Sequence, residues 1–113
     1  MIIRTLNEII GTERDVQWGN GQSRRFITDK DNMGFTMADV TIKGGSESTR
    51  QYPDNLESCY CLEGKGEIED GNGKKHPVSP GTMYAFDKND KHTLRCFQEM
   101  RVVCVFSPAL ITK

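Results

Sequence analysis

Glu57 is the residue whose surroundings most favour chemistry. It lies in the largely apolar segment 56–62, whose alternation places Glu57, Cys59 and Cys61 on one face of a strand. A buried carboxylate is costly unless a cation or hydrogen-bond donors satisfy it. Taken alone, Glu57 is explained equally well as a structural carboxylate bonded to backbone donors and as a metal ligand.

Tyr84 and His92 are the next candidates, because each falls on a strand face that can point inward. Taken alone, Tyr84 is more typical of a core aromatic with a bonded hydroxyl, and His92 of an ordinary surface or core histidine. We interpret Cys59 and Cys61 as small buried apolar residues. Alternate positions on one strand make a poor chelate, and no second pair of this kind is present.

Short, often apolar segments separated by Gly, Pro, Asn and Asp predict an all-β chain. The expected strands are 23–29, 34–43, 47–52, 56–63, 66–69, 75–78, 82–86, 91–97 and 100–107. Turns are expected at 70–73, where Gly and Asn accept a positive φ, and at 79–81, where Pro precedes Gly. This spacing of strands is typical of an antiparallel sandwich or barrel.

The N-terminal region predicts the only helix. Thr5 and Glu8 match a capping box, two isoleucines follow, and Gly11 ends the turn. Residues 1–4 predict a short strand, and residues 12–21 predict a polar loop that ends in an Asn-Gly turn.

Composition narrows the class of protein. A chain of 113 residues predicts one domain over 1–113. Fifteen Lys and Arg against sixteen Asp and Glu argue against a nucleic-acid partner. No apolar run approaches the roughly 20 residues of a membrane helix, and residues 1–6 do not resemble a secretory signal. Without support for secretion, the four cysteines predict reduced thiols and a cytoplasmic protein.

Two spacings resemble the cupin motifs. Glu57 is followed by Gly64 after six residues, and Pro80-Gly81 is followed by His92 eleven residues after the glycine. In cupins these segments lie on neighbouring strands and aim metal ligands into the barrel. The usual His-x-His is replaced by Asn55-x-Glu57, and only two histidines are present, so one subunit cannot form a three-histidine site. The resemblance implies a cupin-type antiparallel β-barrel (jelly roll) with one short N-terminal helix.

A longer resemblance, from about residue 1 to residue 112, is to the ectoine synthase family of cupins. The blocks that carry it are IRTLNEIIGTERDV, SRR at 23–25, MGF at 33–35, NLE at 55–57, YCLEGKGEIED at 60–70, PGTMYAFDKNDKHTLR at 80–95 and VCVFSP at 103–108. The resemblance implies cyclisation of N-γ-acetyl-L-2,4-diaminobutyrate to the compatible solute ectoine, an osmoprotectant, with loss of water. It also implies a head-to-tail homodimer and a ferrous ion, Fe(II), held by Glu57, Tyr84 and His92.

The same resemblance, together with the chemistry of the side chains, gives a substrate site. Arg25 is expected to bind the substrate carboxylate through two hydrogen bonds, although beside Arg24 it also fits a solvated basic face. Trp18 is expected to cover the mouth of the pocket. The expected substrate-binding residues are Trp18, Ser23, Arg25, Tyr52, Asn55, Cys104 and Phe106.

Several positions depart from the family pattern. Ala38, Val40 and Asn55 stand where the family commonly has His, Thr and His, and Arg50-Gln51 replaces a stretch that is often aromatic. A buried polar group that loses its partner costs about 1–3 kcal/mol. Two other hypotheses therefore stay open: a diverged cupin enzyme acting on another amide or amino-acid derivative, and a non-catalytic cupin that binds a metabolite. The resemblance also implies that family members continue past the position of Lys113 with a segment whose Glu and His help to close the pocket.

Overall fold

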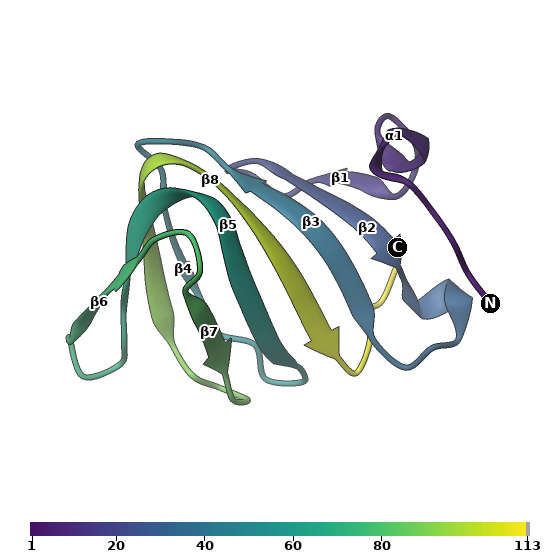
Figure 1. Ribbon diagram of the computed structural model, residues 1–113. Helices are drawn as coiled ribbons and strands as arrows, with labels where there is room; N and C mark the ends of the chain where they lie inside the picture. The colour runs from purple at the N-terminus through teal and green to yellow at the C-terminus, as the bar shows by residue number, and fades with distance from the viewer. Residues whose placement is uncertain (113) are drawn as a thin grey trace.

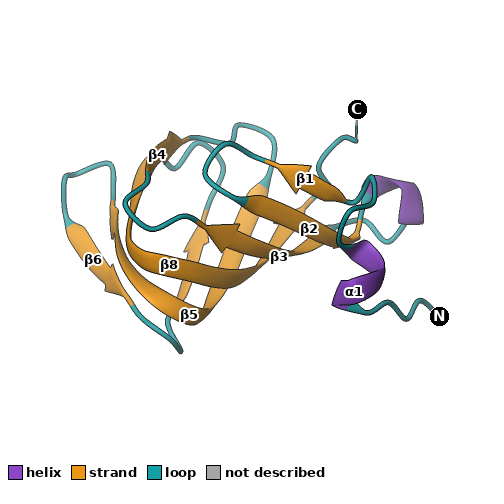
Figure 2. Cartoon of the chain, turned by 90° about the horizontal axis from the view of Figure 1, so that it is seen from above, coloured by secondary structure: helices purple, strands orange, loops and turns teal. Residues whose placement is uncertain are grey.

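The computed structural model describes residues 1–112, and most of this chain is antiparallel β-structure (Figures 1 and 2). The all-β prediction with one short α-helix is confirmed. In chain order the elements are α1 Leu6–Ile9, β1 Asp15–Gln17, β2 Gln22–Ile27, the 3-10 helix η1 Asp29–Asp31, β3 Thr36–Ile42, β4 Glu47–Arg50, β5 Leu56–Glu69, β6 Lys75–Val78, β7 Met83–Phe86 and β8 His92–Ser107.

The strands form a single curved sheet. Its main path is β1-β2-β3-β8-β5-β6, while β4 pairs with β8 and β7 pairs with β5. Figure 1 shows β5 and β8 arching together, so that the sheet folds over its own concave face. Along residues 1–112 the pairing does not return to its starting strand. The expected barrel is therefore a strongly curved sheet whose hydrogen bonding stays open.

The arch depends on close contact between β5 and β8. The sequence predicted each as two strands, but each is one long bent strand. At the bend Gly64 has φ +90°, and a Cβ there would lie 2.1 Å from the carbonyl oxygen of Glu99. No L side chain fits this approach and this backbone conformation together. The glycine of the Glu-x6-Gly spacing thus lies where the bent β5 backbone approaches β8 too closely for a side chain.

The expected turns are present. The backbone N–H of Gly73 donates to Asp70 O at 3.0 Å, and the N–H of Thr82 donates to Ser79 O at 3.0 Å. Gly81 has a φ of +93°, as its place after a proline predicted. These turns set β6 and β7 against β5.

The N-terminal region differs from the prediction. Residues 1–4 are not a strand, and the predicted loop contains β1, which pairs with β2. Thr5 makes no side-chain cap; only its backbone oxygen accepts the Glu8 N–H, at 3.1 Å. A helix of four residues gains little from intrinsic propensity. The burial of Ile9 holds it against the sheet instead.

The concave face carries the core, as the period of two predicted. The inward residues of β3, β5 and β8 are nearly fully buried. Separately, no helix among residues 1–112 has the length and apolar character to cross a membrane. The buried core residues are Ala38, Val40, Ile42, Cys59, Cys61, Ile68, Val78, Cys96, Met100, Val102, Cys104 and Phe106.

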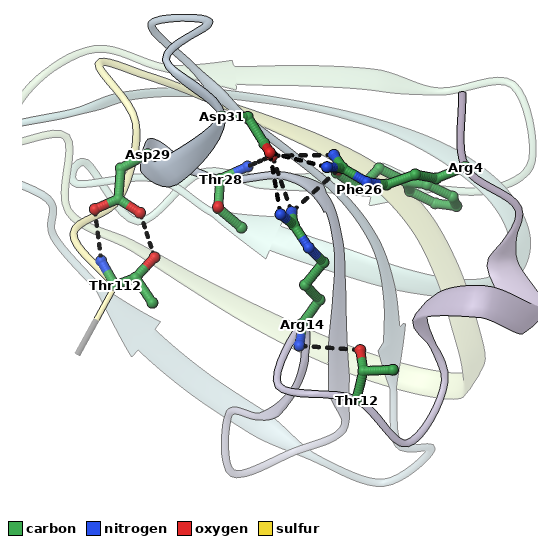
Figure 3. A network of polar contacts seen from close by, with 8 residues as sticks. All are labelled: Arg4, Thr12, Arg14, Phe26, Thr28, Asp29, Asp31 and Thr112. Atoms are coloured by element: carbon green, nitrogen blue, oxygen red, sulfur yellow. Dashed lines mark hydrogen bonds and ion pairs between the residues drawn. The ribbon is translucent and has the colours of Figure 1, made fainter. Parts of the chain in front are cut away.

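A polar cluster ties the N-terminal segment to the end of β2 (Figure 3). Both oxygens of the Asp31 carboxylate accept from Arg4, at 3.0 and 2.9 Å, and from Arg14, at 2.9 and 3.0 Å. The backbone N–H of Thr28 also donates to Asp31, at 3.0 Å. These donors, Arg14 first, lower the pKa of Asp31 well below its usual value.

A second contact in the same region positions the C-terminal segment. The backbone N–H and the hydroxyl of Thr112 both donate to the Asp29 carboxylate (Figure 3). Two residues earlier, the N–H of Leu110 donates to Thr36 Oγ1 at 2.9 Å. These bonds hold residues 110–112 against β3 and η1.

We expect Asp31→Asn to lower the free energy of unfolding by about 2 kcal/mol at pH 7, because two guanidinium groups lose their charged acceptor. Since the folded pKa of Asp31 lies below the unfolded value of about 3.9, this stabilisation is complete at neutral pH and is lost as the pH falls below about 4. Urea unfolding of the native protein and of Asp31→Asn at several pH values measures this difference in the free energy of unfolding. Asp54→Asn is the control, because Asp54 is exposed and makes no hydrogen bond within the described residues. A loss that stays constant down to pH 2.5 would contradict the assignment.

Candidate functional site

The concave face encloses a cavity of about 200 Å³. All but one of the residues predicted for the metal and substrate sites line it, and the exception is Asn55. The predicted residues on its wall are Trp18, Ser23, Arg25, Tyr52, Glu57, Tyr84, His92, Cys104 and Phe106.

The strand register explains why these residues meet. Arg25, Ala38, Cys104, Cys59 and Tyr84 are successive cross-strand partners on β2, β3, β8, β5 and β7. Neighbouring strands lie about 4.8 Å apart, so Arg25 and Tyr84 are four strand spacings apart along the sheet. Its curvature turns both toward the one cavity. A guanidinium and a phenol therefore face the cavity from different parts of its wall.

Glu57 lies two residues along β5 from this row, between Phe86 of β7 and Phe106 of β8. Its carboxyl oxygen Oε2 accepts from Cys59 Sγ at 3.4 Å, and within residues 1–112 it forms no salt bridge. Burial raises the pKa of Glu57 to about 7, although the charge of Arg50 opposes this rise. The group thus has an apolar setting and no cationic partner of its own.

Other acids surround Glu57. Burial raises the pKa of Tyr84, and the nearby Cys59, Cys104 and Glu57 raise it further. Burial also raises the pKa of the Cys59 thiol. Because each of these acids resists losing its proton beside the others, a divalent cation is the counter-charge that would let them ionise.

His92 faces the same cavity from the beginning of β8. Its Nδ1 lies 3.1 Å from Asp90 O, which accepts a hydrogen bond and so assigns the proton to Nδ1. Phe86 stacks on the imidazole with a centroid separation of 3.5 Å and an interplanar angle of 4°. Burial lowers the pKa of His92. Within the described residues Nε2 has no partner, and a neutral ring with a free Nε2 is the form that binds metals.

These observations fit a metal ion at the wall formed by β5, β7 and β8. Glu57 and Tyr84 would supply oxygen and His92 nitrogen to such an ion. A different group of possible ligand atoms also lies close together. One atom each of Glu57, Cys59 and Cys104 lies within 4.8 Å of the other two.

Arg25 is the cation on the β2 side of the cavity. It is half-buried, and Nε donates to Ser23 Oγ at 3.3 Å. In the described chain no carboxylate forms a salt bridge with it, and burial lowers its pKa. Its guanidinium nevertheless stays charged. An unpaired cation in a cavity is suited to binding an anionic ligand.

Aromatic residues form another part of the wall. The indole of Trp18 donates to Thr41 O at 3.2 Å, and the Arg50 guanidinium lies 5.7 Å from its ring centroid. Tyr52 packs edge-on against Phe106, with centroids 5.5 Å apart, and burial raises the pKa of Tyr52 to about 12.

Arg50 was not among the residues predicted for the site, yet it lines the cavity and lies opposite His92 in the sheet. The alternation of residues in the sequence could have placed Arg50 in the site. Ser48, Arg50 and Tyr52 alternate along one segment, and all three line the cavity.

Asn55, also predicted to bind substrate, does not line the cavity. This residue precedes β5, and its side-chain amide donates to Pro108 O at 2.7 Å instead of lining the cavity. The other two departures from the family pattern lie inside. Val40 lines the cavity, and Ala38 is fully buried between Arg25 and Cys104 in the register.

Comparison with known proteins covers the whole chain. A sequence model of the family described as ectoine synthase matches residues 1–113. The L-ectoine synthase of Oceanobacillus iheyensis is 46% identical over 112 residues, which are 98% of this chain and 88% of the relative. That of Desulfatibacillum aliphaticivorans is 48% identical over 113 residues, 97% of this chain and 87% of the relative. The crystal structure of the ectoine synthase from P. lautus superposes with a TM-score of 0.95 at 45% identity, over 99% of this chain and 81% of that one.

The chain belongs to the ectoine synthase family. It is therefore an enzyme of the hydro-lyase class, and the resemblance noted in its sequence is confirmed. An RmlC-like cupin from Shewanella frigidimarina superposes with a TM-score of 0.72 at 17% identity, over 88% of this chain and 86% of that one. At that identity the likeness shows the fold alone, and the fold is that of a cupin.

We expect Arg25→Met to leave the free energy of unfolding unchanged or to raise it by up to about 1 kcal/mol, because it removes a half-buried cation without a partner. Arg14→Met is the matched control and should lose about 2 kcal/mol, since it breaks the bonds to Asp31. Urea unfolding of both variants makes the comparison. Equal destabilisation by the two substitutions would show that Arg25 has a structural role.

Proposed function

We propose that this enzyme closes N-γ-acetyl-L-2,4-diaminobutyrate into ectoine with loss of water, in the cavity that Arg25 and Glu57 share. One observation carries the assignment of roles. The cavity has an unpaired guanidinium on one strand and a carboxyl without a cation three strands away. That pattern suits a substrate with a carboxylate at one end and a carbonyl to be activated at the other.

Ferrous iron is the proposed cofactor, with Glu57, Tyr84 and His92 as its ligands. The support is the donor set, the shared cavity and the Nδ1 contact that leaves His92 Nε2 free. When bound, such an ion supplies a Lewis acid for the acetyl carbonyl and a charge for its developing oxyanion.

The chain's own residues bind and orient the substrate. The guanidinium of Arg25 binds the α-carboxylate and thereby places the adjacent α-amine. Val40, Val102 and Phe106 line the cavity with apolar side chains that offer water no hydrogen-bond partner. Amine and carbonyl are then held within reach, so ring closure gains the advantage of an intramolecular reaction.

Loss of water from the tetrahedral adduct needs a proton on the departing oxygen. Tyr84 Oη is the acid of this chain that we assign to that step. Burial raises its pKa, so Oη carries a proton in the metal-free protein, and a metal ion beside it would make that proton easier to donate. Stacking on Phe86 keeps His92 oriented beside it.

We further propose a homodimer, head to tail as in the family, in a cytosolic setting. The outer face of β5 and β7 leaves Tyr60 and Met83 exposed as cross-strand partners, with Leu62 exposed nearby on β5. Contiguous exposed apolar residues favour an interface. The four free cysteines fit a reducing compartment.

Tyr84→Phe tests the ligand assignment. We expect the iron content after anaerobic ferrous loading to fall, and kcat to fall roughly 100-fold or more, because the substitution removes both a proposed ligand and the proposed general acid. Metal analysis and product formation measure the two effects. Tyr60→Phe is the control, because Tyr60 lies on the outer face of β5. Unchanged iron in Tyr84→Phe would remove Tyr84 from the metal site.

Arg25→Gln tests carboxylate binding. We expect KM to rise roughly 10- to 100-fold, the equivalent of one or two hydrogen bonds to a charged group, while iron content stays the same. Steady-state kinetics with the acetylated diamino acid provide the values. A loss confined to kcat would contradict a substrate-binding role for Arg25.

A further inference from the structure

Two cysteines adjoin the proposed ferrous site without belonging to it. Cys59 of β5 and Cys104 of β8 are direct cross-strand partners, and their sulfur atoms lie 2.7 Å apart. Cys59 Sγ also lies 3.4 Å from Glu57 Oε2. Two thiols and one carboxyl thus lie together, and Glu57 and Cys104 also line the cavity.

The other two cysteines have different surroundings. Cys61 Sγ donates to Glu63 O at 3.3 Å, and Cys96 Sγ lies 3.4 Å from Ile42 O and 3.1 Å from Gln98 O. Backbone carbonyls therefore occupy these thiols. By contrast, Cys59 and Cys104 have each other and Glu57 as neighbours, and Cys104 lines the cavity.

Two sulfurs and one carboxylate form the kind of donor set that favours soft, thiophilic cations over ferrous iron. Zn–S bonds are about 2.3 Å long, so in a tetrahedral site the two sulfurs must separate from 2.7 Å to roughly 3.7 Å. That change requires rotation of the two cysteine side chains. Three protein ligands would leave a fourth position for water or another ligand.

We propose that Cys59, Cys104 and Glu57 form a second metal site that takes Zn²⁺ or Cd²⁺. Because it uses Glu57, it competes with iron for that ligand, so a thiophilic ion inhibits the enzyme by occupying the same wall. Only this competition rests on the proposed ferrous site. The binding of the soft ion stands on the three side chains alone.

Anaerobic titration of the metal-free protein with Cd²⁺ tests the site, with a phosphine reductant present and all four thiols counted as free. We expect a thiolate-to-cadmium charge-transfer band that saturates at one equivalent. Cys59→Ser and Cys104→Ser should each weaken Cd²⁺ binding at least about 100-fold, because removing even an outer partner of a ligand costs 10- to 100-fold. Glu57→Gln should weaken binding while keeping both thiols.

Matched variants separate this site from its neighbours. Tyr84→Phe and Cys61→Ala should keep the band, because neither removes a proposed ligand. Absence of the band in the native protein, or its persistence in Cys104→Ser, would overturn the proposal. So would loss of the band in Cys61→Ala with its retention in Cys59→Ser.

A competition experiment tests the link to catalysis. Zn²⁺ should lower ferrous uptake and turnover of the native protein, and the ratio of turnover with and without Zn²⁺ should return toward one in Cys59→Ala. Equal zinc sensitivity in Cys59→Ala would overturn inhibition through this site. A cadmium band in a protein without cyclase activity would leave the thiol site standing and contradict the proposed function. Cyclase activity without the cadmium band would support the proposed function and contradict the thiol site.

Discussion

A carboxyl group on an apolar wall must keep its proton or gain a cation, and this constraint at Glu57 organises the site. Phe86 and Phe106 flank Glu57 in the sheet, a thiol is its hydrogen-bond donor, and its pKa is raised to about 7. The same burial acts on Tyr84 and Cys59. A cation on this wall would compensate several acids together, whereas any one of them alone carries the full cost of desolvation.

The scaffold makes this crowding possible by bending two long strands together. Gly64 lets β5 bend while it stays packed against β8, and the curved sheet lines one cavity with residues of several strands. The register then places Arg25 and Tyr84 at the two ends of one row of cross-strand partners. The Arg25 guanidinium therefore forms no ion pair with the Glu57 carboxyl. The separation preserves an unpaired cation for a carboxylate and an unpaired carboxyl for a metal.

The inward positions of the main site residues could be predicted from the sequence, because the alternation of side chains along a strand assigns them to faces. It placed Glu57, Tyr84 and His92 inward, and the family resemblance then gave their roles. The contacts that the sequence did not predict depend on pairing between distant strands. The sequence made Cys59 and Cys61 equivalent, and only the register with β8 gives Cys59 a thiol neighbour. Asn55 was assigned by family position, but it lies just before β5, where its amide binds Pro108 O. The polar strand β1 has no apolar alternation to reveal it and forms by pairing with β2.

The most direct test of the account is to identify the product made by the native protein. Anaerobic ferrous-loaded enzyme is incubated with N-γ-acetyl-L-2,4-diaminobutyrate, and proton NMR follows the acetyl methyl signal over time. The account predicts that this signal is replaced by the methyl signal of the cyclic amidine, and that a metal-free sample leaves the substrate unchanged. Iron bound at one equivalent with no ring formation would contradict it.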